Sequence, residues 1–274
     1  FMYTGGTTGK PKGVIWQHAD LLHSLAVPVY SPIGRNLPET VEDAVDAAVE
    51  AGRTGAVPVT MPVVPLMHAT GLFNTIGTML LGGTVGLGNQ GGLDPVAIWS
   101  TVSRKNVSTI IVAGNAVCMP LVEELRTAES RGIPHDLTSL KYVLSSGTSF
   151  SDHLKRQLHE RGHLTITDAI GSSEGGPFVF AVTRSVDDLP ARFFPVPATK
   201  VFDEDDNEVE PGSGIVGVMA YSGPSPLGYH KDEDKTAATF RVIDGVRYAL
   251  PGDHVEVEAD GSIRFMGRRA GVIN

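Results

Sequence analysis

The sequence predicts an α/β fold in which a mostly parallel sheet with flanking helices is followed by a smaller antiparallel, barrel-like β subdomain. Between residues 94 and 167, short apolar runs alternate with segments of helical length. Such alternation is typical of parallel strands joined by right-handed helical crossovers. After about residue 198, short alternating runs separated by Gly- and Asp-containing turns indicate antiparallel hairpins. Strands are expected there at residues 216–220, 247–249, 254–258 and 262–265.

The elements of the first part are predicted from apolar spacing and capping signals. Residues 39–51 have helical spacing, and the apolar residues on one side are Val41, Ala44, Val45, Ala48 and Val49. Asp94 and Pro95 are a typical N-cap and first residue for a helix that runs to about residue 105. Further elements are expected as helices at 119–131 and 151–161, and as strands at 108–114, 141–147 and 164–167. In the helix at 151–161, Leu154 and Leu158 should face inward.

Composition limits the class of protein. The 274 residues are 41% hydrophobic with a formal net charge of −9, which is ordinary for a globular protein and disfavours a nucleic-acid partner. The single cysteine, Cys118, excludes an internal disulfide, and its apolar neighbours predict a packed, reduced thiol. No Asp, Glu, Lys or Arg occurs between Arg53 and Asp94. The Gly, Asn and Thr content of that stretch favours a buried helix followed by a buried strand over a membrane span.

The most informative stretch is residues 4–13, Thr-Gly-Gly-Thr-Thr-Gly-Lys-Pro-Lys-Gly. Glycines let backbone N–H groups crowd around an anion, threonines add hydroxyl donors and lysines add charge, so this loop predicts a phosphate cradle. It is not a Walker loop, because Pro11 follows Gly9-Lys10 where a magnesium-binding hydroxyl would be needed. The alternative is a plain Gly/Thr-rich surface loop.

A second candidate site lies at strand ends, where ligands of parallel sheets gather. Gly114, Ser146, Gly147 and residues 168–174 all fall at such ends. In the last of these segments, a carboxylate beside hydroxyls on a glycine turn is a candidate magnesium site, since Mg²⁺ takes hard oxygen ligands that it shares with phosphate. The alternative is an ordinary helix N-terminus.

Residues 3–13 resemble the signature of the adenylate-forming superfamily of acyl-CoA synthetases, peptide-synthetase adenylation domains and luciferases. Gly5 replaces the usual serine, and the lysine of the motif falls on Lys12. Four more stretches are similar to motifs of that family and occur in its order, at residues 65–71, 168–174, 248–253 and 267–274. The Ile-Gly-Ser-Ser-Glu form at 170–174 is similar to that of actinobacterial acyl-CoA synthetases for fatty acids or sterol side chains.

The resemblance implies a set of site residues. The catalytic group would be Thr7, His68 and Glu174, with Glu174 holding the metal and His68 gating the route between the carboxylate pocket and the thiol tunnel. Asp253 would accept the ribose hydroxyls, and Arg268 would contact ribose or phosphates. The nucleotide-binding residues would be Thr4, Gly5, Gly6, Thr7, Thr8, Gly9, Lys12, Ser146, Gly147, Thr148, Asp168, Ala169, Ile170, Gly171, Ser172, Ser173, Glu174, Asp253 and Arg268.

Several of these residues also have structural interpretations, and two positions depart from the family pattern. His68 alone would be read as a hydrogen-bonded core residue, and residues 251–253 as a turn. Ile170 replaces the aromatic residue that usually stacks on adenine, and Gly271 occupies a hinge position that is usually charged.

The implied activity is that of an ATP-dependent carboxylate–CoA ligase that uses ATP, Mg²⁺ and coenzyme A. The uncharged residues 57–93 favour a fatty or sterol-type acid. The alternatives are an adenylation domain that loads a carrier protein and a nucleotide-binding fragment without turnover. A cytoplasmic location is expected, with small-molecule partners, no nucleic acid, no membrane span and a homodimer as an oligomeric state to test.

The resemblance also implies a domain organisation. Residues 1–198 would form the α/β nucleotide- and acyl-binding subdomain, 199–266 the antiparallel subdomain, and 267–274 the hinge to a small C-terminal domain. On this interpretation the chain is the core of a large N-terminal domain, and the isolated chain should be inactive.

Overall fold

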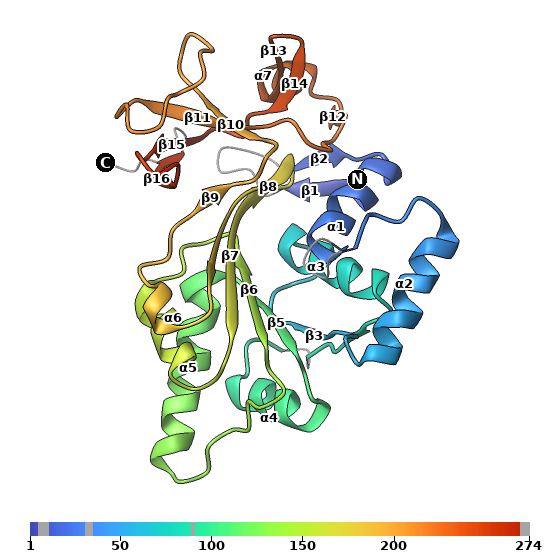
Figure 1. Ribbon diagram of the computed structural model, residues 1–274, viewed down its shortest axis with the longest axis vertical. Helices are drawn as coiled ribbons and strands as arrows, with labels where there is room; N and C mark the ends of the chain where they lie inside the picture. Colours follow the sequence, from blue (N-terminus) through green and yellow to red (C-terminus); the bar gives the residue numbers. More distant parts are fainter. Residues whose placement is uncertain (5–10, 31–34, 89–90, 269–274) are drawn as a thin grey trace. The chain divides into compact units, whose positions relative to one another are not determined.

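The computed structural model describes residues 1–4, 11–30, 35–88 and 91–268 (Figure 1). Most of the expected phosphate loop, residues 5–10, and most of the expected hinge, residues 269–274, lie outside the described residues. Contacts divide the chain into two compact units. The first unit is Phe1–Ser24, Ala169–Ala181 and Arg192–Asn274, and the second is Leu25–Asp168 and Val182–Ala191. This division follows contacts and not sequence texture, so the functional boundary near residue 198 stays a prediction.

The second unit is built on the predicted parallel strands. Strand β3 (Val59–Pro62) pairs in parallel with β4 (Thr84–Val85) and with β5 (Thr109–Val112), which pairs in parallel with β6 (Tyr142–Ser146). The sheet continues through β7 (Thr165–Ser172), β8 (Gly175–Thr183) and β9 (Phe194–Pro195), in the order β4-β3-β5-β6-β7-β8-β9. The strands predicted at 108–114, 141–147 and 164–167 are confirmed.

Helices flank these strands as predicted. Three of them, α4 (Pro95–Lys105), α5 (Gly114–Ser130) and α6 (Asp152–His159), contribute to one apolar cluster. Figure 1 shows α5 and α6 on the opposite side of β5 and β6 from α3 (Ala69–Leu80). Asp94 caps α4 by accepting from Ala97 N at 3.0 Å, and Leu154 and Leu158 are buried. Helix α5 begins five residues earlier than expected, directly after β5.

Helix α2 (Val41–Thr54) confirms the helix predicted at 39–51, and Thr40 and Asp43 form a capping box at its start. Its fully buried residues are Ala47 and Ala51. The valines at positions 41, 45 and 49 are exposed. Helical spacing therefore identified the helix, whereas the small alanines, which allow close approach, determine which side is packed.

The long uncharged stretch contains strand β3, helix α3 and strand β4, and of these β3 and α3 are substantially buried. Helix α3 buries its small residues, which are Thr70, Gly71, Thr75, Gly77 and Thr78. The strand that follows, β4, is exposed or half-buried, so the expectation of a buried strand there was wrong. The reason is its position, since β4 is the edge strand of its sheet. Among the described residues, no helix is long and apolar enough to cross a membrane.

The first unit contains the predicted antiparallel strands. Six of them form a sheet in the order β13-β14-β11-β15-β16, with β10 on β11. Their bounds are β10 (Thr199–Phe202), β11 (Val216–Tyr221), β13 (Phe240–Ile243), β14 (Val246–Ala249), β15 (Asp253–Val257) and β16 (Ile263–Arg268). A smaller sheet has the order β1-β2-β12, from β1 (Met2–Thr4), β2 (Lys12–Ile15) and β12 (Gly228–Tyr229). The remaining elements among the described residues are α1 (His18–Tyr30), the 3₁₀ helix η2 (Val186–Asp188) and α7 (Glu233–Thr239).

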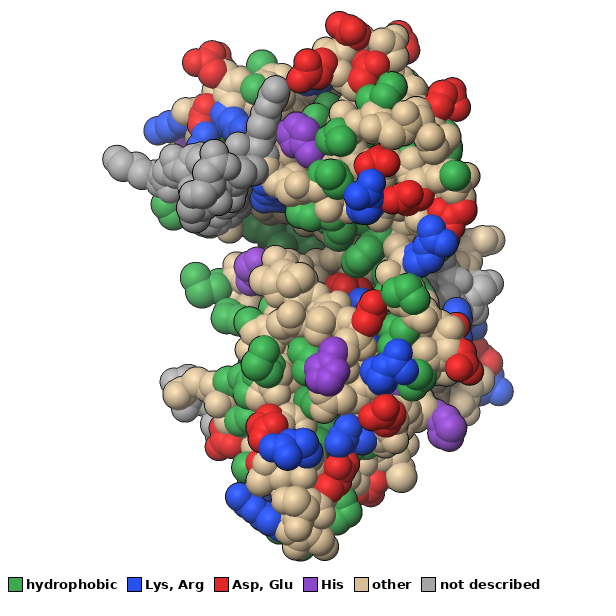
Figure 2. All heavy atoms as spheres, turned by 90° about the vertical axis from the view of Figure 1, so that its left-hand side faces the viewer, with side chains coloured by type: hydrophobic (Ala, Val, Ile, Leu, Met, Phe, Trp, Pro, Cys, Tyr) green, Lys and Arg blue, Asp and Glu red, His purple; other side chains and the backbone are tan. Residues whose placement is uncertain are grey.

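Acidic and basic side chains are interspersed on the face drawn in Figure 2. Elsewhere in the described residues, charged side chains are often paired, for example Arg161 with Glu129 at 2.7 Å and Lys200 with Glu208 at 2.5 Å. Exposed pairs of this kind contribute little to stability. The folding of each unit therefore depends mainly on its apolar clusters.

The thiol of Cys118 should be inert in the folded protein. Cys118 is buried in the cluster under α5, and burial, together with the nearby Asp168 charge, raises the pKa of this thiol to about 12. Because the thiolate is the reactive species, we expect no labelling by an aromatic disulfide reagent at pH 8, and complete labelling in denaturant. Rapid labelling of the native protein would contradict this placement.

Candidate functional site

The predicted site residues that the structure describes fall into two groups, one in each unit. The group in the first unit is Thr4, Lys12, Ala169, Ile170, Gly171, Ser172, Ser173, Glu174, Asp253 and Arg268. The group in the second unit is His68, Ser146, Gly147, Thr148 and Asp168. The remaining predicted residues, Gly5, Gly6, Thr7, Thr8 and Gly9, lie outside the described residues.

Asp253 and Arg268 form an ion pair because the register of two strands places them opposite each other. Asp253 is the first residue of β15 and pairs with Arg268, the last residue of β16. Arg268 Nε contacts Asp253 Oδ1, and Arg268 Nη2 donates to Asp253 Oδ2 at 3.0 Å. This hydrogen bonding raises the pKa of Arg268. A carboxylate has about four lone-pair sites, so Asp253 keeps acceptor capacity for a ligand.

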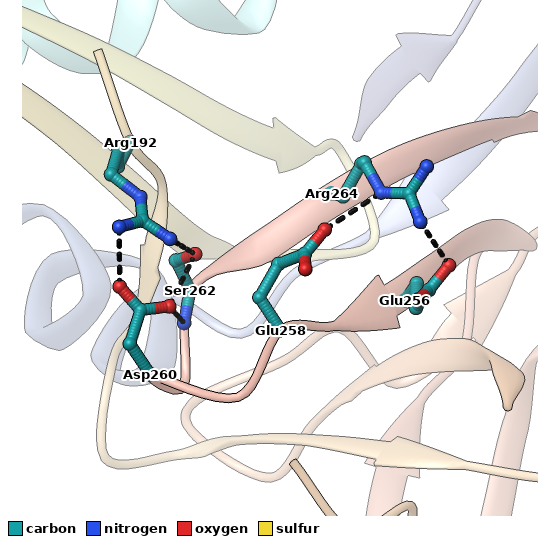
Figure 3. A network of polar contacts seen from close by, with 6 residues as sticks. All are labelled: Arg192, Glu256, Glu258, Asp260, Ser262 and Arg264. Carbon is teal, nitrogen blue, oxygen red and sulfur yellow. Dashed lines mark hydrogen bonds and ion pairs between the residues drawn. The ribbon is translucent and has the colours of Figure 1, made fainter. Parts of the chain in front are cut away.

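The hairpin that carries this pair is held by polar contacts near its turn (Figure 3). Arg264 on β16 contacts Glu256, its partner in the strand register, and donates to Glu258 Oε1 at 2.7 Å. Arg192 lies 2.6 Å from Asp260 Oδ2 and donates to Ser262 Oγ at 2.9 Å. These contacts lie near the turn of the hairpin, at the end of β15 and β16 away from Asp253 and Arg268.

Glu174 lies in the tight connection between β7 and β8, where its carboxylate is buried and oriented by hydrogen bonds. Its Oε1 accepts from the Tyr229 hydroxyl at 2.6 Å, and its Oε2 accepts from Ser173 Oγ at 3.2 Å. The backbone of the same connection is held by Trp16, whose Nε1 donates to Ser173 O at 3.0 Å. The carboxylate is therefore presented in one orientation.

Tyr229 and Asp232 extend this site, and neither was identified from the sequence. Lys12 Nζ lies 2.6 Å from Asp232 Oδ2 and 5.6 Å from the centroid of the Tyr229 ring. Burial, followed by the Glu174 charge and hydrogen bond, raises the pKa of Tyr229, so its hydroxyl remains a donor. After the hydrogen bond to Asp253, the charge of Glu174 also acts to raise the pKa of Arg268. These residues therefore share one electrostatic environment in the first unit.

The signals that could have identified these two residues are weak. Gly228-Tyr229 is a glycine–aromatic pair with an acid three residues later, a pattern common in turns. The partners of Tyr229 and Asp232 are 55 and 220 residues away in the sequence. Spacing rules act over a few residues, so pairs this distant carry no local pattern.

In the second unit, His68 and the loop after β6 lie together. His68 is an exposed N-cap residue of α3, and its Nδ1 accepts from Thr70 N at 3.3 Å. The interpretation of His68 as a core histidine is therefore wrong. Gly147 has φ +95°, and a Cβ at this position would lie 3.6 Å from His68 Cε1. Thr148 Oγ1 donates to Ala113 O at 3.0 Å, which ties the loop to the end of β5.

Asp168 differs from the other predicted carboxylates because it is enclosed. It is 4% exposed, and Lys155 Nζ donates to its Oδ2 at 3.0 Å. Burial raises the pKa of Asp168, while Lys155 acts in the opposite direction. Nucleotide contact by this side chain stays a prediction.

The residues around Glu174 fit a magnesium ion that is shared with a phosphate ligand. They offer a carboxylate and the hydroxyls of Ser172 and Ser173, which are hard oxygen donors. The described part of the chain contains no group of three His, Cys, Asp or Glu side chains suited to a metal. Mg²⁺ commonly takes one or two carboxylates and completes its shell with phosphates and water, so the single Glu174 carboxylate is compatible with such an ion.

Comparison with known proteins identifies relatives of the chain. It is 40% identical over 277 residues to a medium/long-chain-fatty-acid–CoA/3-oxocholest-4-en-26-oate–CoA ligase of Mycolicibacterium smegmatis. The aligned region covers 100% of this chain and 49% of the relative. It is 36% identical over 278 residues to a 3-oxocholest-4-en-26-oate–CoA ligase of Rhodococcus rhodochrous, with the same shares. The chain thus spans about half the length of these relatives.

The fold is shared with a solved adenylate-forming enzyme. The structure of o-succinylbenzoate coenzyme A synthetase from Bacillus subtilis, in complex with ATP and magnesium ion, superposes with a TM-score of 0.71 at 21% identity, covering 99% of this chain and 50% of that one. At this identity the similarity shows the fold alone. The profile of the AMP-binding enzyme family matches residues 1–229, and the chain therefore belongs to that family.

Proposed function

We propose that the chain is the nucleotide-binding core of an ATP-dependent carboxylate–CoA ligase. The observation that carries the proposal is the arrangement in the first unit, where the oriented Glu174 carboxylate lies in one electrostatic environment with the Asp253–Arg268 pair. A fixed carboxylate suits a metal that bridges phosphates, and the aspartate–arginine pair suits a ribose and its phosphate. The relatives named as CoA ligases support the same activity.

The reaction would proceed in two steps. A carboxylate oxygen attacks the α-phosphorus of ATP, an acyl–phosphate bond forms, and the bond to the β-phosphate breaks to release pyrophosphate. A deprotonated thiol then attacks the acyl carbon, and AMP leaves with the bonding electrons. Both steps develop charge at phosphate oxygens, so the contribution of the protein is mainly orientation and charge stabilisation.

The predicted site residues that the structure describes would each have a defined task in this reaction. Lys12 would leave Asp232 to contact phosphate, together with Thr7. Glu174 would bind magnesium, which neutralises phosphate charge when bound. Asp253 would accept from the ribose hydroxyls while Arg268 keeps it oriented. His68 would line the path of the acyl group and the thiol, and the loop at 146–148 would contact the nucleotide.

The acid would be a medium- or long-chain fatty acid or a sterol side-chain acid. Helix α3 turns its small residues inward and leaves larger apolar ones, such as Leu72 and Ile76, half-exposed. An apolar acid suits such a surface, whereas an amino acid would require an acidic partner for its ammonium group. The cytoplasmic location and the functional division at residues 198 and 266 belong to the same proposal.

The decisive experiment is thioester formation by the intact protein with ATP, Mg²⁺ and coenzyme A. The panel of acids should include octanoate, palmitate, a C26 sterol acid and an amino acid. We expect acyl-CoA from the fatty or sterol acids and none from the amino acid. Adenylate formation without transfer to coenzyme A would indicate a carrier protein as the acceptor, and the absence of both products would refute the proposal.

Glu174 and its hydrogen-bond donor are the first pair to test. Glu174→Gln should abolish most pyrophosphate release, and Tyr229→Phe should lower it about tenfold, because a hydrogen bond to a charged group contributes about 1.5–3 kcal/mol. Tyr142→Phe, which changes an exposed tyrosine on β6, is the control and should behave as wild type. An unchanged rate in Glu174→Gln would remove Glu174 from the site.

Asp253 can be tested by nucleotide affinity. Asp253→Asn should weaken AMP binding, measured by calorimetry, about tenfold or more, since a charged acceptor of the ribose hydroxyls is lost. The matched control is Asp206→Asn, because Asp206 pairs with Arg241 in the same unit but is exposed. Equal AMP affinity in wild type and Asp253→Asn would reduce the Asp253–Arg268 pair to a structural contact.

A further inference from the structure

A buried lysine in the second unit has no role in the reaction described above. Lys155 lies on α6, is 2% exposed, and donates to Asp168 Oδ2 at 3.0 Å. Its Nζ also lies 5.2 Å from the centroid of the buried Phe150 ring. Enclosing two charges is costly, and apolar replacements of such pairs are often neutral or stabilising. Stability alone therefore does not explain this pair.

The ion pair is one end of a directional chain of hydrogen bonds. Asp168 is hydrogen-bonded to the Ser145 side chain, and Ser145 Oγ accepts from Gly114 N at 3.2 Å. An ionised carboxylate only accepts, so the Ser145 hydroxyl must donate to Asp168. Donation therefore runs from Gly114 through Ser145 to Asp168, which also accepts from Lys155. This hydrogen-bond chain joins α6 to the middle of β7, the end of β6 and the residues that follow β5.

The Gly114 end of this chain holds the backbone of the loop after β6. Gly114 has φ +46°, and a Cβ there would lie 2.7 Å from Thr148 O, so the loop packs directly against it. Asn115 N donates to Ser149 O at 2.8 Å, and Ser151 N donates to Asn115 Oδ1 at 2.9 Å. The position of residues 146–149 therefore depends on the position of residues 114 and 115.

We propose that Lys155 and Asp168 are positioning residues, which act through Ser145 and Gly114 to hold the loop of residues 146–148 in its ligand-binding conformation. The proposal rests on the proposed function, in which this loop contacts the nucleotide. It assigns Asp168 a task inside the protein in place of contact with the nucleotide. The enclosure of Asp168 favours this assignment, because a carboxylate packed against a buried lysine has little surface to offer a ligand.

Three variants of the intact protein test the proposal, with AMP as the calorimetric probe. Ser145→Ala breaks the chain of hydrogen bonds without changing any charge. Asp168→Asn leaves one amide oxygen for which both Lys155 and Ser145 compete. The double variant Lys155→Met/Asp168→Asn frees that oxygen to accept from Ser145. We expect both single variants to raise the AMP dissociation constant about tenfold, because small displacements at a site are costly, and the double variant to recover most of the affinity.

Amide hydrogen exchange gives a readout that does not depend on the proposed function. Ser145→Ala should lose protection at the amides of Asn115 and Ser151, whereas the double variant should keep it. The control is Glu129→Gln, which breaks the ion pair between Arg161 and Glu129 and should change neither AMP affinity nor protection at these amides.

Each outcome decides the proposal. If the double variant binds AMP as weakly as Asp168→Asn while protection is retained, Asp168 contacts the ligand and the proposal is overturned. Wild-type affinity and protection in Ser145→Ala would overturn it as well. If the wild-type protein itself does not bind AMP, the proposed function fails. Hydrogen exchange alone then decides whether the hydrogen bonds from Lys155 to Gly114 hold the loop.

Discussion

The hydrogen bond from the Tyr229 hydroxyl to Glu174 connects the three-stranded sheet of the first unit to the carboxylate that we propose binds magnesium. Tyr229 is on β12, which pairs with β2, and β2 carries Lys12. Trp16 follows β2 directly and donates to Ser173 O beside Glu174. One side chain of this sheet and one that directly follows its strand β2 therefore hold both the carboxylate and the backbone of the connection between β7 and β8.

The charges of five side chains in the first unit bear on how a negatively charged ligand would be bound. Lys12 and Arg268 supply two positive charges, and Glu174, Asp232 and Asp253 supply three negative ones. A triphosphate approaching such a set meets a slight excess of negative charge, which disfavours binding. Added positive charge is needed, and a divalent cation on Glu174 would supply it.

Local patterns predicted much of this fold and little of its site geometry. Periodicity and caps located the helices and strands between residues 94 and 167, because those signals act over a few residues. The same signals misjudged the exposure of β4, which depends on its position at the sheet edge. Tyr229, Asp232 and Lys155 were missed because their partners lie 13 to 220 residues away. The Asp253–Arg268 contact depends on strand register, which includes an irregularity at residues 254–255.

Exposure distinguishes two aspartates that the sequence placed in one category. Both Asp168 and Asp253 are almost fully buried and both accept from a cation. The difference lies in the cation, because the Lys155 side chain is 2% exposed and that of Arg268 is 41% exposed. An accessible cation leaves part of an ion pair open to a ligand, so Asp253 is the better placed of the two aspartates to share its carboxylate with one. The accessibility of the partner, and not the burial of the carboxylate, therefore distinguishes the two aspartates.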